Sequence, residues 1–283
     1  MDQSPLYNTP AGEALVMALY DAVLQNWMVP SQTQMVSTRC GKTFVIASGD
    51  PFAPPVVLLH GAGGNSAMWA GDVADYASQF RVYAVDLPGE AGKSTPNRPP
   101  WAGAAFGEWL EDVLNALNVE QASLVGISQG GWAALKFAVM MPERVTKLVL
   151  IAPAGIVPDR RSFLPLAIML SLLGKAGIKR FVQALLADQN PPDRDGLVER
   201  VAEMSAHFKP RIGVIPLFSD AELRRLTMPV LLLGGTKDIC RDVAKIGARL
   251  QMLTPQLSVN LISGVGHIVL NTSGCAIQFL TQP

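Results

Sequence analysis

Short apolar runs alternate with amphipathic segments through most of the chain. Runs rich in apolar residues occupy 55–61, 81–89, 123–128, 144–155, 228–235 and 257–264. Runs of this length, bounded by turn residues, are typical of strands buried on both faces of a sheet. Between them, helical spacing of apolar residues marks 66–80, 106–119 and 129–141. The alternation predicts an α/β fold with a mostly parallel sheet covered by helices on both faces.

Two features precede this alternation. Residues 12–27 place apolar side chains at four-residue steps, at Leu15, Leu19, Val23 and Trp27. This spacing predicts an amphipathic helix packed on the core, and a membrane or partner helix is the alternative. Residues 34–49 predict two short strands joined by a turn at Cys40-Gly41.

One long segment interrupts the alternation. Residues 155–227 separate two expected strands, whereas ordinary connections are about 2 to 6 residues long. The apolar stretch at 163–178 breaks at Gly174-Lys175 and is shorter than the roughly 20 residues that cross a bilayer. We therefore expect a helical cap at 155–227, an N-terminal helical segment at 1–30 packed on the core, and an α/β core formed by residues 31–154 and 228–283.

The composition is that of a folded protein without a strong field of either sign. Hydrophobic residues make up 49% and charged residues 16%, with 23 basic and 23 acidic side chains. This balance disfavours disorder and a nucleic-acid partner. Three scattered cysteines, Cys40, Cys240 and Cys275, and an N-terminus without signal-peptide features predict a cytoplasmic protein with no membrane span. The oligomeric state stays open.

The strongest chemical signal is the pentapeptide Gly126-Ile127-Ser128-Gln129-Gly130. It matches the nucleophile elbow G-x-S-x-G, a pattern that a chain of this length contains by chance about one time in ten. Its setting, after an expected strand and before an expected helix, is the one that an elbow requires. Glycines on both sides permit the tight corner, and the helix N-terminus favours negative charge developing beside Ser128.

A serine nucleophile needs a base, and only one of the three histidines has a suitable position. His267 follows the last expected strand, in the order serine, acid, histidine that elbow enzymes have. His60 ends an early strand and is expected to be structural, with its ring bonded to nearby backbone. His207 lies in the insertion in a polar context and is expected to be a solvated residue.

The histidine in turn needs a carboxylate to orient it. Asp238 follows the run at 228–235 after a short turn, which is the best position in the sequence. Asp242 and Asp159 are alternatives, although Asp242 suits a helix N-terminus and Asp159 a surface turn.

Further residues complete the expected site. An oxyanion hole needs backbone N–H donors, and the candidates are Gln129, after the nucleophile, and Ala62, in the glycine-rich loop after an early strand. Candidates for lining the substrate pocket are apolar residues, most of them from the insertion: Trp69, Phe163, Leu164, Leu166, Ile168 and Met169.

Three glycine-containing patterns point to other chemistry but are incomplete. Residues 61–66, with Asp86 about twenty residues on, resemble a dinucleotide fingerprint in which Ser66 replaces the third glycine. Residues 92–94 and 41–43 resemble the end of a phosphate loop, but lack the required earlier glycine. No His/Cys/Asp spacing suggests zinc. We therefore expect no cofactor and no metal.

As an ordered set, HGAGG, DLPGEAGKS, GISQGG, GGTKD and GVGH make the chain resemble α/β-hydrolase-fold enzymes of the carboxylesterase type, from about residue 35 onward. The resemblance implies an eight-stranded sheet, a cap after the sixth strand, no metal or organic cofactor, and the catalytic set Ser128, Asp238 and His267. Glu90 departs from the pattern, because many relatives have a histidine there; this loop is not part of the triad.

These observations favour a serine hydrolase that cleaves a carboxylic ester through an acyl-enzyme. A thioesterase, a carbon–carbon bond hydrolase or a cofactor-free perhydrolase could use the same triad. An aspartate-nucleophile dehalogenase or epoxide hydrolase is disfavoured, since the elbow residue is serine. The alternative from another class is a non-catalytic protein that binds a small molecule on the same fold.

Overall fold

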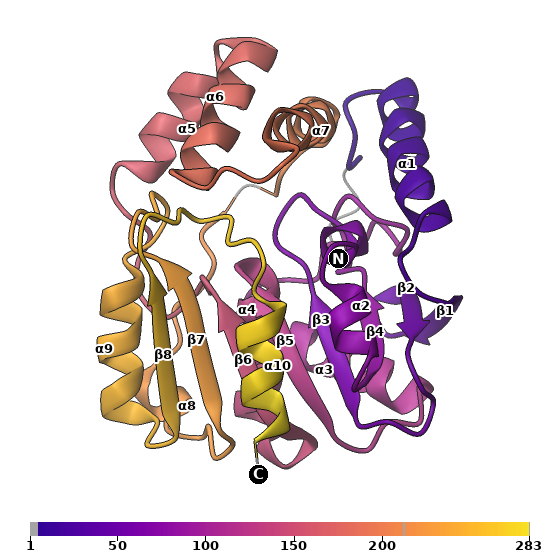
Figure 1. Ribbon diagram of the computed structural model, residues 1–283, viewed down its shortest axis with the longest axis vertical. Helices are drawn as coiled ribbons and strands as arrows, with labels where there is room; N and C mark the ends of the chain where they lie inside the picture. Colours follow the sequence, from indigo (N-terminus) through magenta and orange to yellow (C-terminus); the bar gives the residue numbers. More distant parts are fainter. Residues whose placement is uncertain (1–4, 212, 283) are drawn as a thin grey trace.

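An eight-stranded sheet forms the centre of the computed structural model, which describes residues 5–211 and 213–282. The strand order is β1-β2-β4-β3-β5-β6-β7-β8 (Figure 1). Pairing is antiparallel between β1 and β2 and between β2 and β4, and parallel elsewhere. The expected mostly parallel α/β sheet is thus confirmed. The strands are β1 (Ser31–Thr38), β2 (Gly41–Ser48), β3 (Pro55–Leu59), β4 (Arg81–Val85), β5 (Ala122–Ile127), β6 (Val145–Ile151), β7 (Val230–Gly235) and β8 (Leu257–Ile262).

Helices cover both faces of the sheet, as the continuous apolar strands require. In β3, Val57 and Leu59 point to one face while Val56 and Leu58 point to the other, and all four are fully buried. The first face packs on α3 (Ala105–Ala116), α4 (Gln129–Met140) and α9 (Val243–Leu253). The second packs on α2 (Val73–Ala77), α10 (Ser273–Thr281) and part of α1 (Pro10–Gln25).

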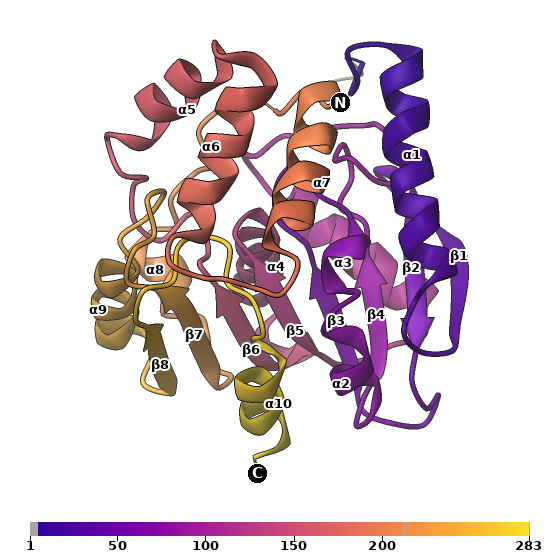
Figure 2. The ribbon, with the colours of Figure 1, turned by 45° about the horizontal axis from the view of Figure 1, so that its top comes forward.

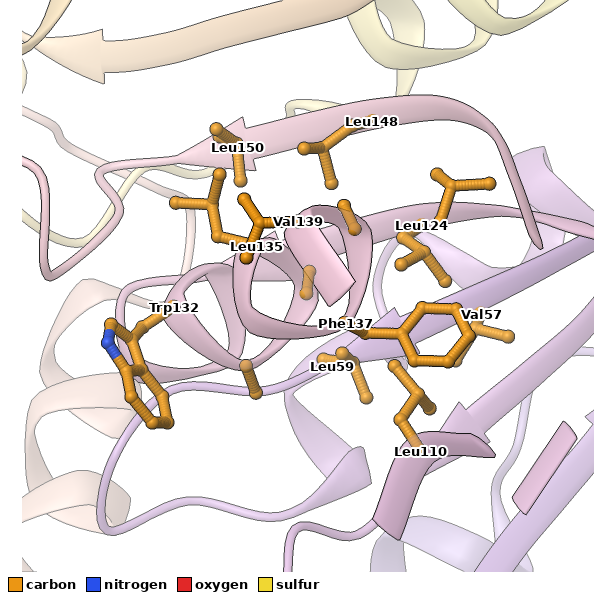
Figure 3. Packing of buried hydrophobic residues seen from close by; sticks show 14 of the residues in the cluster. Val57, Leu59, Leu110, Leu124, Trp132, Leu135, Phe137, Val139, Leu148 and Leu150 are labelled. Atoms are coloured by element: carbon orange, nitrogen blue, oxygen red, sulfur yellow. The ribbon is translucent and has the colours of Figure 1, made fainter. Parts of the chain in front are cut away.

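Helix α4 is the most deeply buried of these helices and directly follows the expected nucleophile. Its apolar side chains interlock with those of β3, β5, β6 and α3, as Figure 3 shows for Trp132, Leu135, Phe137 and Val139 against Val57, Leu59, Leu110, Leu124, Leu148 and Leu150. Burying one such side chain contributes about 1.5–3 kcal/mol. Ser128, which immediately precedes α4, is therefore anchored to a tightly packed part of the core.

The helix expected at 66–80 is shorter and broken. A 3-10 turn, η1 (Ser66–Trp69), is capped by the Asn65 side chain, and α2 begins only at Val73. Gly71 lies between them, and glycine is a poor helix former because it loses the most backbone entropy.

Four helices fill the long segment between β6 and β7: α5 (Phe163–Ser171), α6 (Gly174–Leu186), α7 (Arg194–His207) and the short α8 (Asp220–Leu223). The first three lie together beyond the carboxyl ends of the parallel strands, and α1 stands beside α7 (Figures 1 and 2). That contact is close, since a Cβ on Gly12 would lie 2.8 Å from the His207 ring. Within the described residues, no helix has both the length and the apolarity needed to cross a bilayer.

Candidate active site

Three strands of the sheet deliver Ser128, Asp238 and His267 to one place. Ser128 follows β5, Asp238 follows β7 and His267 lies in the loop after β8. The Ser128 Oγ is 3.1 Å from His267 Nε2, and His267 Nδ1 is 2.8 Å from the Asp238 Oδ2. The carboxyl ends of parallel strands meet at one edge, which is why residues 110 and 29 positions apart in the sequence form a continuous hydrogen-bonded chain.

The elbow has the strained geometry that its glycines suggest. Ser128 has φ 52° and ψ −107°, in the positive region that non-glycine residues rarely adopt. A Cβ on Gly130 would lie 2.3 Å from the Leu59 carbonyl oxygen, and one on Gly126 would lie 2.5 Å from the Gly130 oxygen. Side chains at either position would collide with backbone. The glycines therefore allow β3, β5 and α4 to converge under the serine.

Asp238 is held as an anion at the base of this chain. Its side chain is fully buried, and its Oδ1 accepts hydrogen bonds from the backbone N–H groups of Cys240 and Arg241 at 2.6 and 3.0 Å. Burial alone pushes its pKa upward, but the hydrogen bond and charge of His267, with those two N–H donors, outweigh burial and hold the pKa below its ordinary value. An ionised Asp238 accepts a hydrogen bond from the Nδ1–H of His267, which leaves Nε2 without a proton and facing the serine.

The two alternative acids have other partners. Asp242 caps the N-terminus of α9 by accepting from the Lys245 N–H at 3.2 Å, which confirms its expected helix-capping role. Asp159 lies 2.9 Å from the guanidinium Nε of Arg241. Of the three acids, Asp238 is the one hydrogen-bonded to His267.

The two candidate oxyanion donors lie in segments that a buried carboxylate ties together. Gln129 begins α4, and its side-chain amide donates to Glu90 Oε1 at 2.8 Å. The N–H of Gly63, next to Ala62, donates to Glu90 Oε2 at 2.7 Å. Burial raises the pKa of Glu90, and these two hydrogen bonds only partly offset the rise. Glu90 therefore bridges the two segments, a role that the sequence did not indicate.

His60 and His207 lie outside the hydrogen-bonded chain, as expected. The fully buried ring of His60 donates from Nδ1 to the Gly61 carbonyl at 2.8 Å and accepts at Nε2 from the Leu87 N–H at 2.9 Å. Both ring nitrogens are used by backbone, which confirms a structural role. His207 is partly exposed and lies 3.2 Å from Glu203.

Sequence reasoning missed Arg241, which stands against the nucleophile. Its Nη1 donates to Ser128 Oγ at 3.0 Å and lies 3.4 Å from His267 Nε2. The side chain is only 7% exposed. Nothing in the sequence distinguishes this arginine from a surface residue in a helix-leading loop, because its contact with Ser128 joins positions 113 residues apart.

Four of the expected pocket residues need correction. Trp69 is fully buried in the core, edge-on to Tyr76, so its ring does not line an open pocket. Leu164, Ile168 and Met169 are 63%, 52% and 55% exposed on α5, so they do not stand in an enclosed pocket. Leu170 of the same helix is buried, and the Phe163 ring packs on Phe181 of α6 with 6.0 Å between the ring centroids. Phe163 and Leu166 are half-buried, and their place beside a substrate stays a prediction.

Asp238, Cys240 and His267 offer ligand atoms within 4.8 Å of one another, so their fit to a metal ion can be judged. Burial, the largest effect, raises the pKa of the Cys240 thiol, which disfavours the thiolate that metals bind. A metal would also have to replace the hydrogen bond between Asp238 and His267. The donor set suits the serine relay better than a cation.

Comparison with known proteins places the chain in a family. The sequence profile described as the Alpha/beta hydrolase family matches residues 56–274. The chain therefore belongs to the alpha/beta hydrolase family. It is 34% identical over 257 residues to the uncharacterized carboxylesterase nap of Bacillus subtilis, covering 88% of this chain and 85% of that protein.

Solved structures agree with this placement. Carboxylesterase CesB (YbfK) from Bacillus subtilis superposes with a TM-score of 0.83 at 31% identity, covering 96% of this chain and 99% of that one. The naproxen esterase, carboxylesterase NP, from the same species gives a TM-score of 0.84 at 28% identity, covering 97% of this chain and 100% of the other. The fold expected from the ordered motifs is thus confirmed.

Proposed function

We propose that this protein is a serine hydrolase that cleaves carboxylic esters through a covalent acyl-enzyme. The observation that carries the proposal is the continuous hydrogen-bonded chain from Ser128 through His267 to a buried, ionised Asp238. The similarity of this protein to two carboxylesterase structures supports ester hydrolysis as the reaction. A binding protein on the same fold would have no need to keep such a chain at a strained serine.

In the proposed mechanism, His267 carries a proton from Ser128 to the leaving alcohol. His267 Nε2 takes the proton of Ser128 as its oxygen attacks the ester carbonyl, and Asp238 stabilises the imidazolium that forms. The backbone N–H groups of Ala62 and Gln129 hold the resulting oxyanion. His267 then returns the proton to the leaving alcohol. A water molecule attacks the acyl-enzyme by the same route in reverse, which releases the acid and restores Ser128.

Residues 155–227 form the cap of this site in our proposal. Their first three helices stand beyond the carboxyl ends of the strands that carry the triad (Figure 2). The end of α6 is bonded to the histidine loop, with the Ile268 N–H donating to the Leu185 carbonyl at 3.0 Å. Substrate would therefore enter between this cap and the edge of the sheet.

Substitution of the nucleophile tests the proposal. Ser128→Ala should lower turnover of p-nitrophenyl esters by about a thousandfold or more, since removing one triad member disables the relay. Ser123→Ala on the same strand is the control, because that hydroxyl is bonded to Thr146 and not to the site. Near-wild-type hydrolysis by Ser128→Ala would refute the assignment. Thioesters with the same acyl groups, assayed in parallel, separate an esterase from a thioesterase.

A further inference from the structure

Arg241 places a buried positive charge at the reaction centre that the proposed hydrolytic mechanism does not use. Its Nη1 touches the nucleophile oxygen at 3.0 Å and the Ala152 carbonyl at 3.4 Å. Both are neutral acceptors. A serine hydrolase needs no cation at this point, because its oxyanion is held by backbone N–H groups.

The charge of this guanidinium is incompletely balanced. Its single ion-pair partner among the described residues, Asp159, is 47% exposed and approaches only Nε, at 2.9 Å. That nitrogen is buried and lies outside hydrogen-bonding geometry. For Nη2, no hydrogen bond occurs within the described part of the chain. A buried guanidinium with unused donors is costly unless an anion completes its shell.

The donor pattern of arginine indicates which anion fits. A guanidinium presents pairs of parallel N–H groups that match the two oxygens of a carboxylate, and such charge-assisted pairs are about twice as strong as neutral hydrogen bonds. A substrate carboxylate would therefore displace Ser128 Oγ as the partner of Nη1. The serine oxygen is then released for attack.

The same anion would also favour the proton transfer. His267 becomes positive when it takes the serine proton, and Arg241 Nη1 is 3.4 Å from the nitrogen that receives it. Two cations at that distance repel each other in a buried site. A carboxylate bound to Arg241 offsets this repulsion, whereas a neutral ester does not.

We propose that the substrates of this protein are esters that carry a carboxylate within a few bonds of the scissile carbonyl, such as monoesters of short dicarboxylic acids, and that Arg241 binds this carboxylate. The inference rests on the proposed ester hydrolysis, and it specifies the substrate class of the same site. Arg241 is in this account a specificity-determining residue.

The kinetic test compares two esters of equal shape and different charge. Monoethyl succinate and ethyl 4-methylpentanoate differ by exchange of a carboxylate for an isopropyl group. The wild type should hydrolyse the succinate monoester with a kcat/KM about tenfold or more higher, the scale of one charge-assisted hydrogen bond. Arg241→Gln should abolish this preference, mainly by raising the KM for the succinate monoester. Arg161→Gln, an exposed arginine of the neighbouring segment, should retain the preference and controls for net charge.

A binding measurement keeps this test independent of catalysis. In Ser128→Ala, which cannot form an acyl-enzyme, calorimetry should still show tighter binding of monoethyl succinate than of its neutral counterpart, and the added Arg241→Gln should remove the difference. This binding result would support the carboxylate site independently of catalysis. Failure of a fluorophosphonate to label Ser128 would instead overturn the proposed hydrolase and leave the binding result standing. Equal binding of both esters, a wild-type preference for the neutral ester, or equal losses on both esters in Arg241→Gln would overturn the role of Arg241.

Discussion

At the residue scale, two buried carboxylates near this site have pKa values shifted in opposite directions. The pKa of Asp238 lies below its ordinary value despite burial, because His267 and two backbone N–H groups favour the anion. The pKa of Glu90 lies above its ordinary value, because burial outweighs its hydrogen bonds from Gln129 and Gly63. One acid is thus kept charged to orient the base. The other, Glu90, joins the two segments that carry the candidate oxyanion donors.

The two shifts predict opposite dependences of stability on pH. Asp238 contributes stability that is present above its ordinary pKa of 3.8 and is lost as the pH falls through its lower folded value. Glu90 keeps its proton in the folded state after the unfolded chain has released it, so stability falls as the pH rises above 4.5 toward the raised folded pKa.

Glu90→Gln should therefore flatten the fall in stability above pH 4.5, because an amide does not titrate. The free energy of unfolding in urea, measured between pH 4 and 8, checks this against the wild type. Glu120→Gln serves as control, since that carboxylate is exposed and should leave the slope unchanged. An identical slope in Glu90→Gln and the wild type would mean that Glu90 ionises normally in the fold.

The identity of the triad acid has its own test. Asp238→Asn should lower turnover by about ten-thousand-fold, the loss seen in a comparable triad, because an amide stabilises the wrong imidazole tautomer. Asp242→Asn and Asp159→Asn should lower turnover far less. Asp242 caps α9 and Asp159 pairs with Arg241, and neither is bonded to His267. If Asp159→Asn were the crippled variant and Asp238→Asn active, the acid would be misassigned while the serine and histidine stood.

The residue types of the relay could be predicted because each follows a strand with a recognisable apolar run. Ser128 also has a local signature, the two flanking glycines. Arg241 and the bridging role of Glu90 could not be predicted in this way. Arg241 contacts Ser128, and Glu90 contacts Gly63, only because separate loops come together in the fold. No local pattern of charge or spacing in the sequence indicates these contacts.

At the scale of elements, the close approach of the β3 backbone to α4 positions the nucleophile. Strand β3 passes so near the first turn of α4 that a Cβ on Gly130 would lie 2.3 Å from the Leu59 oxygen and 2.4 Å from the His60 oxygen. Backbone atoms cannot yield as a flexible side chain can. The spacing of β3, β5 and α4 thus depends on this glycine.

Gly130→Ala should consequently destabilise the fold by about 1–3 kcal/mol, the usual cost of forcing atoms into a packed core. It should also lower ester hydrolysis by a hundredfold or more, on the scale of about 1 Å of misplacement at a reacting group. Gly71→Ala is the matched control, because a Cβ there meets no atom within 4 Å. Melting temperature and turnover check both variants; equal values for the two would show that the elbow tolerates a side chain.

Elements with a long apolar run were predictable, and their orientation was less so. The helix after Ser128 and most of the parallel strands follow from continuous burial, whereas the edge strand β8 is largely exposed. In α5 nearly every residue is apolar, so the sequence pattern does not indicate which side faces inward, and Leu164 and Met169 prove to face solvent. Helix 66–80 broke at Gly71 for local reasons that its apolar spacing concealed.

At the scale of the whole molecule, the insertion is fastened to the loop that carries the base. Ala187 forms a β-bridge with Val265, and the Asp188 N–H donates to the Gly264 carbonyl at 3.1 Å. A Cβ on Gly266 would lie 2.2 Å from the Leu185 oxygen. Movement of α6 would therefore move the segment that precedes His267.

The proposed cap gives different expectations for the half-buried and the exposed positions of α5. Polar substitutions at its half-buried positions, Phe163→Ser and Leu166→Ser, should reduce hydrolysis of long-chain esters relative to short-chain esters if these residues contact the acyl chain, because apolar contacts are then lost. The exposed residues Leu164 and Met169 are the controls, and serine there should leave the profile unchanged. An unchanged chain-length profile in all four variants would show that α5 does not contact substrate.

The most direct measurement of the central claim is the mass of the intact protein after treatment with a fluorophosphonate. Such probes form a covalent bond only with a serine activated by its base. We expect a single adduct that maps to Ser128, much slower labelling in His267→Ala, and none in Ser128→Ala. An unlabelled wild type, or an adduct on any other serine, would contradict it.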